Sequence, residues 1–366
     1  MNIKWLYAGI SLLLCVGAAA QQPSSKACYV DPFIGTDGMG HTFPGACVPF
    51  GGVQLSPDTD TIPHNVNGKY QPRAYEYCAG YRYSDPTIVG FSHTHFSGTG
   101  HSDLGDILLM PTTGALRLNP GTADNPDSGY RSRFSHSTEK ASAGHYEVTL
   151  GDYGVKAQLT ATTRVGIHKY SYPKGTDGQV ILDLIHGIYN YDGKTLWAEV
   201  QVRNDTLLTG YRITNGWART NYTYFAISFS QPITEYGYAD REKINYKGGW
   251  SKFDQYHNFP AMAGRKLVAW FKFATSKNPE LTVKVALSAT GAEGALKNLA
   301  AEASGKSFDQ IASAASNAWE KELSQIEIQG TEGEKKMFYT SLYHTMINPS
   351  VYMDVDGKYR GLDHEI

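Results

Sequence analysis

The segment Tyr146–Pro173, YEVTLGDYGVKAQLTATTRVGIHKYSYP, decides the fold class of this chain. Apolar and polar residues alternate along it in steps of two, which is the period of a β-strand with one buried face. Comparable runs cover residues 179–185, 206–214, 222–230, 267–275 and 281–289. Turn dipeptides such as Asp177-Gly178 separate them. Because no helical pattern intervenes, we predict a mainly β chain in which antiparallel sheets form a β-sandwich.

The hydrophobic period changes after Ala289. Apolar residues recur at helical spacing at Phe308, Ile311, Ala315, Trp319 and Leu323. Ser307 and Gln310 form a capping box before them, and Thr331 and Glu334 repeat this device before a second helix. Asn348-Pro349 ends that helix. We therefore expect a helical region from about residue 293, followed by a hairpin over residues 351–362.

Composition excludes several classes of function. The 366 residues carry 33 basic and 35 acidic side chains, so no excess of one charge attracts nucleic acid. The chain has 25 tyrosines, 6 tryptophans and 38 glycines, which is typical of a loop-rich β protein. Aromatic side chains also suit the apolar faces of sugars.

The N-terminus has the features of a secretory signal peptide over residues 1–20. Lys4 supplies the positive charge, Leu6–Val16 is an apolar run too short to span a bilayer, and Ala18-Ala19-Ala20 offers a cleavage site. Cys15 follows two leucines, where lipidation requires a small residue. We therefore expect a secreted protein, periplasmic or on the outer surface, with no membrane span after cleavage. Its cysteines Cys28, Cys47 and Cys78 allow at most one internal disulfide.

Histidines and acids cluster in Gly90–Pro111, GFSHTHFSGTGHSDLGDILLMP. Two histidines separated by one residue on a strand point to the same face, a spacing that metal-binding pairs use. The candidates are His93, His95, His101, Asp103 and Asp106. The segment matches no fixed set of ligand spacings, and its Ser-Gly-Thr-Gly turn can hold buried imidazoles by hydrogen bonds. We favour the structural interpretation over a transition-metal site.

Two further segments resemble ligand-binding loops but lack the residues that such loops require. The glycine-rich segment Gly35–Thr59 lacks the endings of phosphate-binding loops, so its glycines are expected to let a loop pass close to a ligand or to backbone. His41 is its candidate polar side chain. Asp354-Val355-Asp356-Gly357 is predicted to form a turn rather than a calcium loop. We find no GxSxG elbow and no complete acid–base pair.

Three segments carry a family resemblance: residues 31–59, residues 78–114 and Tyr146–Pro173. In order and nearly word for word, they resemble the N-terminal domain of glycoside hydrolase family 92, which comprises bacterial exo-acting α-mannosidases, many of them α-1,2-specific. The resemblance implies a sandwich over 21–292, a helical linker over 293–330 and, over 331–366, the start of an (α/α)6 barrel that is truncated at Ile366. It also implies calcium dependence, inversion of configuration and mannose-containing oligosaccharides as substrates.

The resemblance places the catalytic acid, the base and the calcium ligands in the barrel, beyond Ile366, so no catalytic residue and no metal ligand is assigned in this chain. It implies that an aromatic residue just before the CAGYRY motif, Tyr77, stacks near the leaving sugar. Tyr77, Cys78 and His41 are the candidates for substrate contact. Tryptophan accompanies α-1,2 preference at this position, so tyrosine leaves the linkage open. The histidine segment is expected to buttress the pocket wall.

Three functions follow as hypotheses. The first is an exported α-mannosidase, of which this chain supplies the pocket wall without being active by itself. The second is a stand-alone carbohydrate-binding β-sandwich without catalysis. The third is a metal hydrolase built on the histidine cluster.

Overall fold

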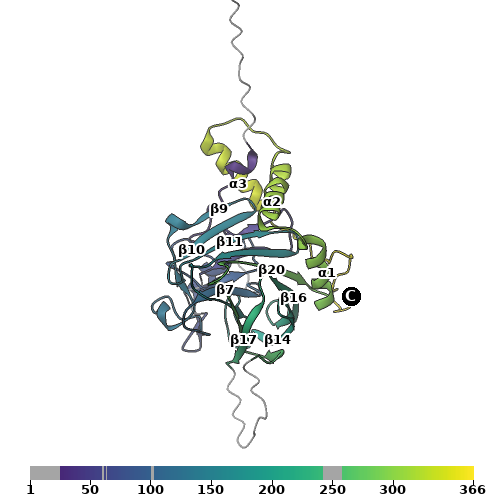
Figure 1. Cartoon of the computed structure of the whole chain (residues 1–366). Helices are drawn as coiled ribbons and strands as arrows, with labels where there is room; N and C mark the ends of the chain where they lie inside the picture. The colour runs from purple at the N-terminus through teal and green to yellow at the C-terminus, as the bar shows by residue number, and fades with distance from the viewer. Residues whose placement is uncertain (1–24, 60–61, 63, 100–102, 242–257) are drawn as a thin grey trace, which may run out of the picture.

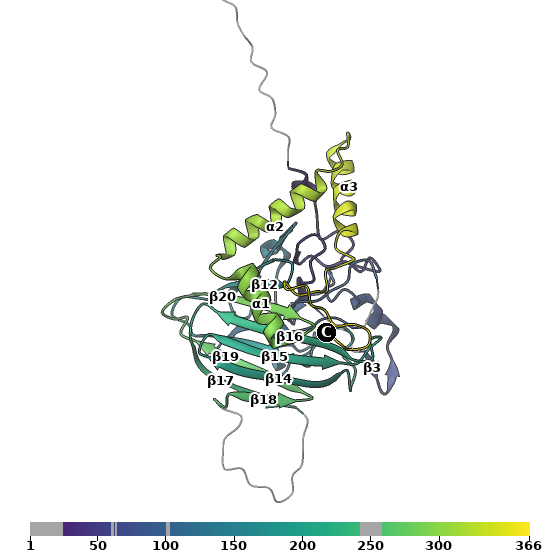
Figure 2. The ribbon, with the colours of Figure 1, turned by 90° about the vertical axis from the view of Figure 1, so that its right-hand side faces the viewer.

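A computed structural model of the chain describes residues 25–59, 62, 64–99, 103–241 and 258–366. The expected signal peptide and His101 lie outside these residues. Two large antiparallel sheets face each other, and helices cover one end and part of one outer face (Figures 1 and 2). This confirms the predicted mainly β class and its sandwich. Within the described residues, no helix is both long enough and apolar enough to cross a bilayer.

The first sheet has seven strands. Its order is β1 (Ala46–Cys47), β2 (Gln54–Asp58), β6 (Gly90–Ser92), β7 (Leu108–Thr113), β13 (Gly178–Asp183), β19 (Leu267–Phe273) and β17 (Ile233–Asp240). The N-terminal strands are short and were not predicted, because two- to six-residue strands carry little alternation. Two small ribbons accompany the sheets: β3 (Asn65–Val66) with β4 (Lys69–Tyr70), and β5 (Thr87–Ile88) with β8 (Ser132–Arg133).

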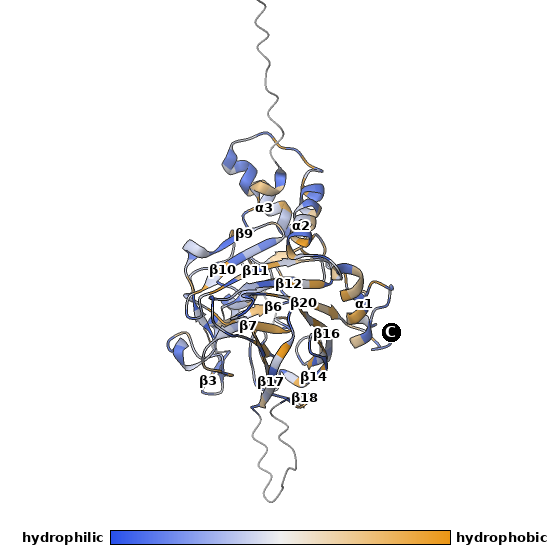
Figure 3. Ribbon diagram, in the orientation of Figure 1, coloured by the Kyte–Doolittle hydropathy of each residue, from blue (hydrophilic) through white to orange (hydrophobic). Residues whose placement is uncertain are grey.

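The second sheet has nine strands and contains the Tyr146–Pro173 segment. Its order is β18 (Ala261–Gly264), β14 (Thr195–Asn204), β15 (Leu207–Thr214), β16 (Asn221–Phe229), β20 (Glu280–Ser288), β12 (Val165–Ser171), β11 (Val155–Ala161), β10 (His145–Leu150) and β9 (Lys140–Ser142). The alternating runs therefore became β10, β11, β12, β15, β16 and β20 in this sheet, and β13 and β19 in the other. Side chains such as Val148, Leu159 and Phe225 fill the core between the sheets. Figure 3 shows the hydrophobic strand β7 near the centre of the molecule.

Three α-helices follow the last strand. They are α1 (Ala292–Ala303), α2 (Phe308–Leu323) and α3 (Glu332–Thr345). Both predicted capping boxes are present, at Ser307 with Gln310 and at Thr331 with Glu334. α1 lies across β16 and β20, while α2 and α3 project from one end of the sandwich (Figures 1 and 2). Trp319 of α2 anchors this end, because its indole N–H donates to Cys47 O at 2.7 Å.

The short 3-10 helices lie in the loops. They are η1 (Lys26–Tyr29), η2 (Pro72–Tyr77), η3 (Pro126–Ser128) and η4 (His136–Thr138). η1 contacts α2 and α3, and it forms a second hydrophobic cluster with them.

The C-terminal segment differs from the prediction. The hairpin expected over 351–362 is wrong, because the described backbone there forms no strand. Instead, Val351 N donates to Phe50 O and Phe50 N donates to Met346 O, both at 2.8 Å, so the segment lies along the glycine-rich loop. The predicted turn at Asp354–Gly357 is present, with Gly357 N donating to Asp354 O at 2.9 Å. Asp354 is buried and accepts hydrogen bonds from Ser288 and Asn298, at 2.7 Å each.

Candidate functional site

The histidine segment connects β6 to β7, which are neighbours in the seven-stranded sheet. His93 N donates to Asp106 O and Gly105 N donates to Thr94 O, both at 2.9 Å, so the segment folds back on itself. β6 ends at Ser92, before the first histidine. The expectation that His93 and His95 share one strand face is therefore wrong, and the two imidazoles belong to separate hydrogen-bond chains.

His93 lies in a fully buried chain between the sheets. Its Nδ1 is 2.6 Å from Ile107 O, and a carbonyl can only accept, so Nδ1 carries the proton. Nε2 then accepts from His168 Nε2 of β12 at 3.0 Å. His168 Nδ1 in turn accepts from Tyr170 OH at 2.8 Å. Burial lowers the pKa of His93 to about 3 and that of His168 well below its usual value, so both rings are neutral.

His95 belongs to a second buried chain, centred on Asp58 of β2. Asp58 Oδ1 lies 2.8 Å from His95 Nε2, and Oδ2 lies 2.7 Å from His186 Nε2. His95 Nδ1 is also 2.7 Å from Gln54 O. Burial alone would raise the pKa of Asp58, but its contacts with His95 and His186 lower it below the usual range. The carboxylate therefore stays ionised and fixes both rings.

The two aspartates of the segment are also engaged. Asp106 is buried, pairs with Arg212 of β15 at 3.1 Å and accepts from Thr94 Oγ1 at 2.9 Å. Asp103 accepts the backbone N–H groups of Trp217 and Ala218, at 2.8 Å each, and so holds the hairpin between β15 and β16. Asp103 and Asp106 thus face different partners and do not form an acid–base pair with each other.

These contacts argue against the hypothesis that the histidine segment holds a metal ion. Across residues 25–366, leaving aside the gaps in the description, no group of three or more His, Cys, Asp and Glu side chains is placed to hold a metal ion. The ring nitrogens of His93 and His95 already have partners. His101, the third histidine of the segment, lies outside the described residues.

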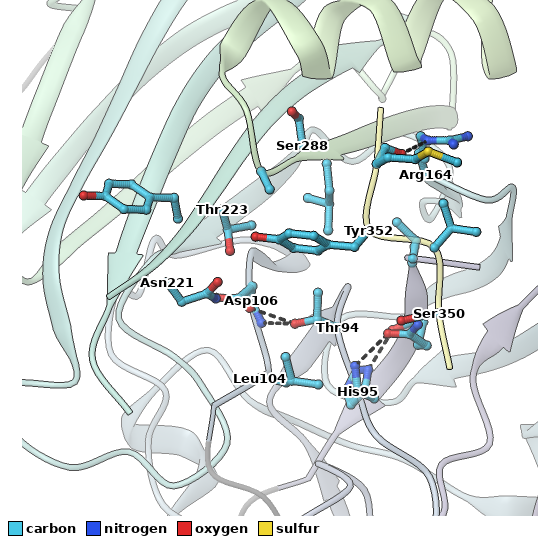
Figure 4. A pocket seen from close by; sticks show the side chains of 18 of the residues that line it. Thr94, His95, Leu104, Asp106, Arg164, Asn221, Thr223, Ser288, Ser350 and Tyr352 are labelled. Atoms are coloured by element: carbon cyan, nitrogen blue, oxygen red, sulfur yellow. Dashed lines mark hydrogen bonds between the residues drawn. The ribbon is translucent and has the colours of Figure 1, made fainter. Parts of the chain in front are cut away.

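A cavity of about 250 Å³ lies beside the histidine segment (Figure 4). His95 and Asp106 contribute to its wall, together with Thr223 of β16 and Tyr352 of the C-terminal segment. Figure 4 shows Thr223 and Asn221 on one side and the Tyr352 ring reaching toward them. Arg164 closes another side, where its Nε donates to Met353 O at 2.6 Å. The volume suits a small ligand rather than an oligosaccharide.

Both carboxylates in the wall of this cavity have protein partners. Asp106 is held by Arg212, and Asp354 is held by Ser288 and Asn298. The cavity can therefore enclose a small polar molecule, but these two acids are positioned to maintain the fold rather than to exchange protons with it.

The three candidates for substrate contact lie outside the wall of this cavity, around η2. Tyr77 is 2% exposed, so the stacking on a sugar expected of it has no free ring face in this structure. The last turn of η2 directs Tyr77 inward and leaves Tyr75 at 38% exposure. Cys78 is buried, with its Sγ 2.6 Å from Tyr75 O and 2.9 Å from Tyr189 OH.

His41 is the candidate that retains an unused polar atom. Its ring packs edge-on against Tyr75, with 4.8 Å between centroids, and its buried Nε2 has no hydrogen-bond partner. The backbone of His41 has φ 52°, an uncommon conformation for a residue other than glycine. Burial lowers its pKa, which keeps the imidazole neutral and able to accept.

Sequence reasoning missed the partners of these residues: Asp58, His168, His186 and Arg212. One signal was available for Arg212, because it shares the inward parity of Leu208 within the alternating run 206–214. A charged residue at an inward position requires a buried counter-charge. No comparable signal identifies its partner, since Asp106 is 106 positions away.

Comparisons with known proteins agree with this architecture. Residues 29–288 match the model of the glycosyl hydrolase family 92 N-terminal domain, and residues 294–366 match that of the family 92 catalytic domain. Among solved structures, the chain is similar to a family 92 α-mannosidase of Bacteroides thetaiotaomicron in complex with mannoimidazole. The identity is 38% and the TM-score 0.83, over 93% of this chain and 42% of that one.

Two other relatives are more distant. A family 92 inverting mannosidase of the same organism is 26% identical, with a TM-score of 0.72 over 93% of this chain and 43% of that one. An uncharacterized secreted glycosidase of Arthroderma benhamiae is 24% identical over 93% of this chain and 44% of its own length. The chain therefore spans less than half the length of each of these relatives.

Proposed function

The chain belongs to glycosyl hydrolase family 92, and on that premise we propose that it forms the pocket-wall sandwich of an exo-acting α-mannosidase for mannose-containing glycans. The observation that carries the proposal is the likeness of 93% of this chain to a mannosidase in complex with mannoimidazole. The mainly β domain and the helices that follow it correspond to the two family domains in order.

We place the catalytic acid and base in polypeptide that this chain does not include. The two acids in the wall of the cavity, Asp106 and Asp354, are committed to protein partners. An inverting glycosidase requires one carboxylic acid and one carboxylate, both free to face the scissile bond. On this proposal the 366-residue chain is inactive by itself.

Calcium dependence is part of the proposal, but the described residues do not fit a calcium site. Calcium takes six to eight oxygen ligands. The Asp354 carboxylate, the nearest feature to a calcium loop, accepts from Ser288, Thr290 and Asn298 instead. We therefore propose that the calcium ion binds to the polypeptide that also carries the catalytic acid and base. No residue of this chain is given a role in the calcium-dependent step.

The finer points rest on the family resemblance and on the N-terminal sequence. Inversion and α-1,2 preference come from the resemblance. Export is supported by Lys4, the apolar run Leu6–Val16 and the three alanines after it, and the Arthroderma benhamiae relative is itself called secreted. We propose a periplasmic location, and fractionation of the source cells separates it from the outer surface.

The source locus tests the proposal. A reading frame that continues past codon 366, and whose product releases mannose from an aryl α-mannoside only while calcium is present, supports it. A stop codon directly after Ile366, with mannan binding but no hydrolysis, favours the alternative of a stand-alone carbohydrate-binding sandwich. Hydrolysis by the 366-residue chain alone overturns the location given to the acid and base.

A further inference from the structure

The outer face of the nine-stranded sheet carries aromatic and polar side chains in register. Trp197 of β14 lies opposite Ile213 of β15, and Glu199 lies opposite Tyr211, which in turn lies opposite Tyr224 of β16. The alternate residues Ala198, Val200 and Phe225 are buried in the core between the sheets. Because side chains alternate across a strand, the first set faces away from that core.

This part of the face is open. α1 lies mainly across β16 and β20 and also contacts β15, while Figure 2 shows β14 beyond it. The edge strand β18 places Ala263 opposite Glu199 and Ala261 opposite Gln201, and both alanines are exposed. Their small side chains leave space beside the carboxylate and the amide. Trp197 is 41% exposed.

Hydrogen bonds hold these side chains in place. Tyr211 OH donates to Glu199 Oε2 at 3.3 Å, and Gln201 Nε2 donates to Glu199 Oε1 at 2.5 Å. The rings of Tyr211 and Tyr224 lie 5.7 Å apart between centroids. The set is therefore ordered before any ligand arrives, which reduces the entropy lost on binding.

The open group of aromatic and polar side chains ends at Tyr222, which the C-terminal segment partly covers. Arg360 lies over the Tyr222 ring at 4.7 Å, and His364 packs against its edge. Tyr222 is thus partly covered by the C-terminal segment. We call the remaining open set the β14–β16 platform: Trp197, Glu199, Gln201, Tyr211 and Tyr224.

We propose that the β14–β16 platform is a non-catalytic binding site for a neutral glycan chain. Aromatic faces pack against the C–H surfaces of sugar rings, while a carboxylate and an amide between them accept and donate hydrogen bonds to hydroxyls. Glu199 and the neighbouring Arg203 balance in charge, which disfavours an anionic polysaccharide. The inference rests on the proposed function for one point, that the glycan contains mannose.

The alternating polar groups argue against an apolar protein partner. The core of a protein–protein interface is depleted in charged residues. On this platform, the Glu199 carboxylate and the Gln201 amide lie beside the rings. The Arg203 Nη1 group donates to Gln201 Oε1 at 3.2 Å and so extends this row of polar groups. A glycan uses such groups without leaving them unpaired.

Affinity electrophoresis of the 366-residue chain in gels containing yeast mannan tests the inference. Trp197→Ala and Tyr224→Ala are each expected to weaken retention, by roughly 2-fold to 10-fold for the loss of one stacked ring. Trp197→Phe should recover part of the retention. Trp217→Ala is the matched control, because it removes an 81% exposed tryptophan outside the platform and should bind as the unmodified chain does.

The outcomes separate the platform from the proposed function. Unchanged melting with weakened mannan retention in Trp197→Ala supports the platform. Retention of a neutral polysaccharide other than mannan, lost in the same variant, supports the platform and counts against the mannosidase assignment. Equal retention of the unmodified chain and of both platform variants overturns the inference. A change of oligomeric state in Trp197→Ala also overturns it, in favour of a protein contact.

Discussion

His168 Nε2 lies 3.0 Å from His93 Nε2, and this contact joins the nine-stranded sheet to the segment between β6 and β7. Gly166 of β12 makes room for it, because a Cβ at that position would lie 2.6 Å from His93 Cδ2. Two neutral imidazoles, a tyrosine and a carbonyl thus form one directional chain through the core. A proton added at His93 Nε2 would direct its N–H at the N–H of His168 Nε2, so two donors would face each other.

We therefore predict loss of stability in mild acid. The unfolded chain binds a proton at His93 near pH 6.5, whereas the folded chain binds one only near pH 3. Between these values the unfolded state holds more protons, so the free energy of unfolding falls as pH falls. One such group contributes up to ~1.4 kcal/mol per pH unit. The contribution of neutral His93 to the free energy of unfolding is fully present above about pH 6.5 and is lost as the pH falls toward about 3.

Urea unfolding across this pH range, for the unmodified chain and for His93→Gln, measures the effect. The variant is expected to be less stable at neutral pH and to show a shallower dependence on pH, while the exposed His364→Gln should follow the unmodified chain. Parallel pH dependences for all three proteins would show that His93 does not titrate in this way.

The helices and this network differ in how far the sequence could predict them. The capping boxes at Ser307 and Thr331 are local, because the side chain and the backbone N–H that it caps lie three residues apart. The interior of α2 shows its period within sixteen residues. His93 and His168 are 75 residues apart, and only the pairing of whole sheets brings them together. Sequence alone therefore suggested that His93 was structural without identifying its partner.

The candidate site also depends on contacts between residues that are far apart in the sequence. His95 and Asp106 were recognised as chemically notable, but their roles depend on Asp58 and Arg212, which come from other strands. The family resemblance suggests Tyr77 as a sugar contact, whereas the direction of its ring depends on the short helix η2. The outer-face platform follows from strand register, which a single sequence does not provide.

The buried pair Arg212–Asp106 gives a second prediction. Burial lowers the pKa of Arg212 and the contact with Asp106 opposes that shift, so each charge depends on the other. Arg212→Ala leaves Asp106 buried without its counter-charge and should cost about 3–5 kcal/mol of unfolding free energy. Replacing both residues, with Arg212→Met and Asp106→Leu, should cost clearly less than the single change.

Chemical denaturation of the single and double variants provides the measurement. Arg133→Ala is the control, because its ion pairs with Asp127 and Asp152 lie at the surface and should contribute little. A double variant as unstable as Arg212→Ala would contradict the prediction. It would indicate that the volume of the two side chains, rather than their charges, stabilises this region.

Gly52 gives a third prediction, because the glycine-rich loop passes beneath the C-terminal segment there. A Cβ at Gly52 would lie 2.5 Å from Val351 O, closer than contact allows. Gly52→Ala should therefore displace residues 346–354 and speed amide hydrogen exchange at Val351, whose N–H donates to Phe50 O. Gly333→Ala is the control, since a Cβ there meets nothing within 4 Å. Equal exchange in both variants would exclude the close approach.

The three described cysteines give the last prediction. All are free thiols, with Cys28 exposed and Cys47 and Cys78 buried. Burial raises the pKa of Cys47 to about 12, and the Cys78 thiol donates to Tyr75 O at 2.6 Å. The thiolate is the reactive form, so both buried cysteines should be inert in the folded chain.

Titration of the native chain with a coloured disulfide reagent should therefore show one rapid equivalent, which Cys28→Ser removes. Denaturant should release the two buried thiols, and Cys15 as well wherever the N-terminal segment is retained. Rapid reaction of a second thiol in native Cys28→Ser would show that the loop around Cys78 opens. That result would also bear on His41 and Tyr75, since Cys78 holds the carbonyl of Tyr75 and the His41 ring packs against the Tyr75 side chain.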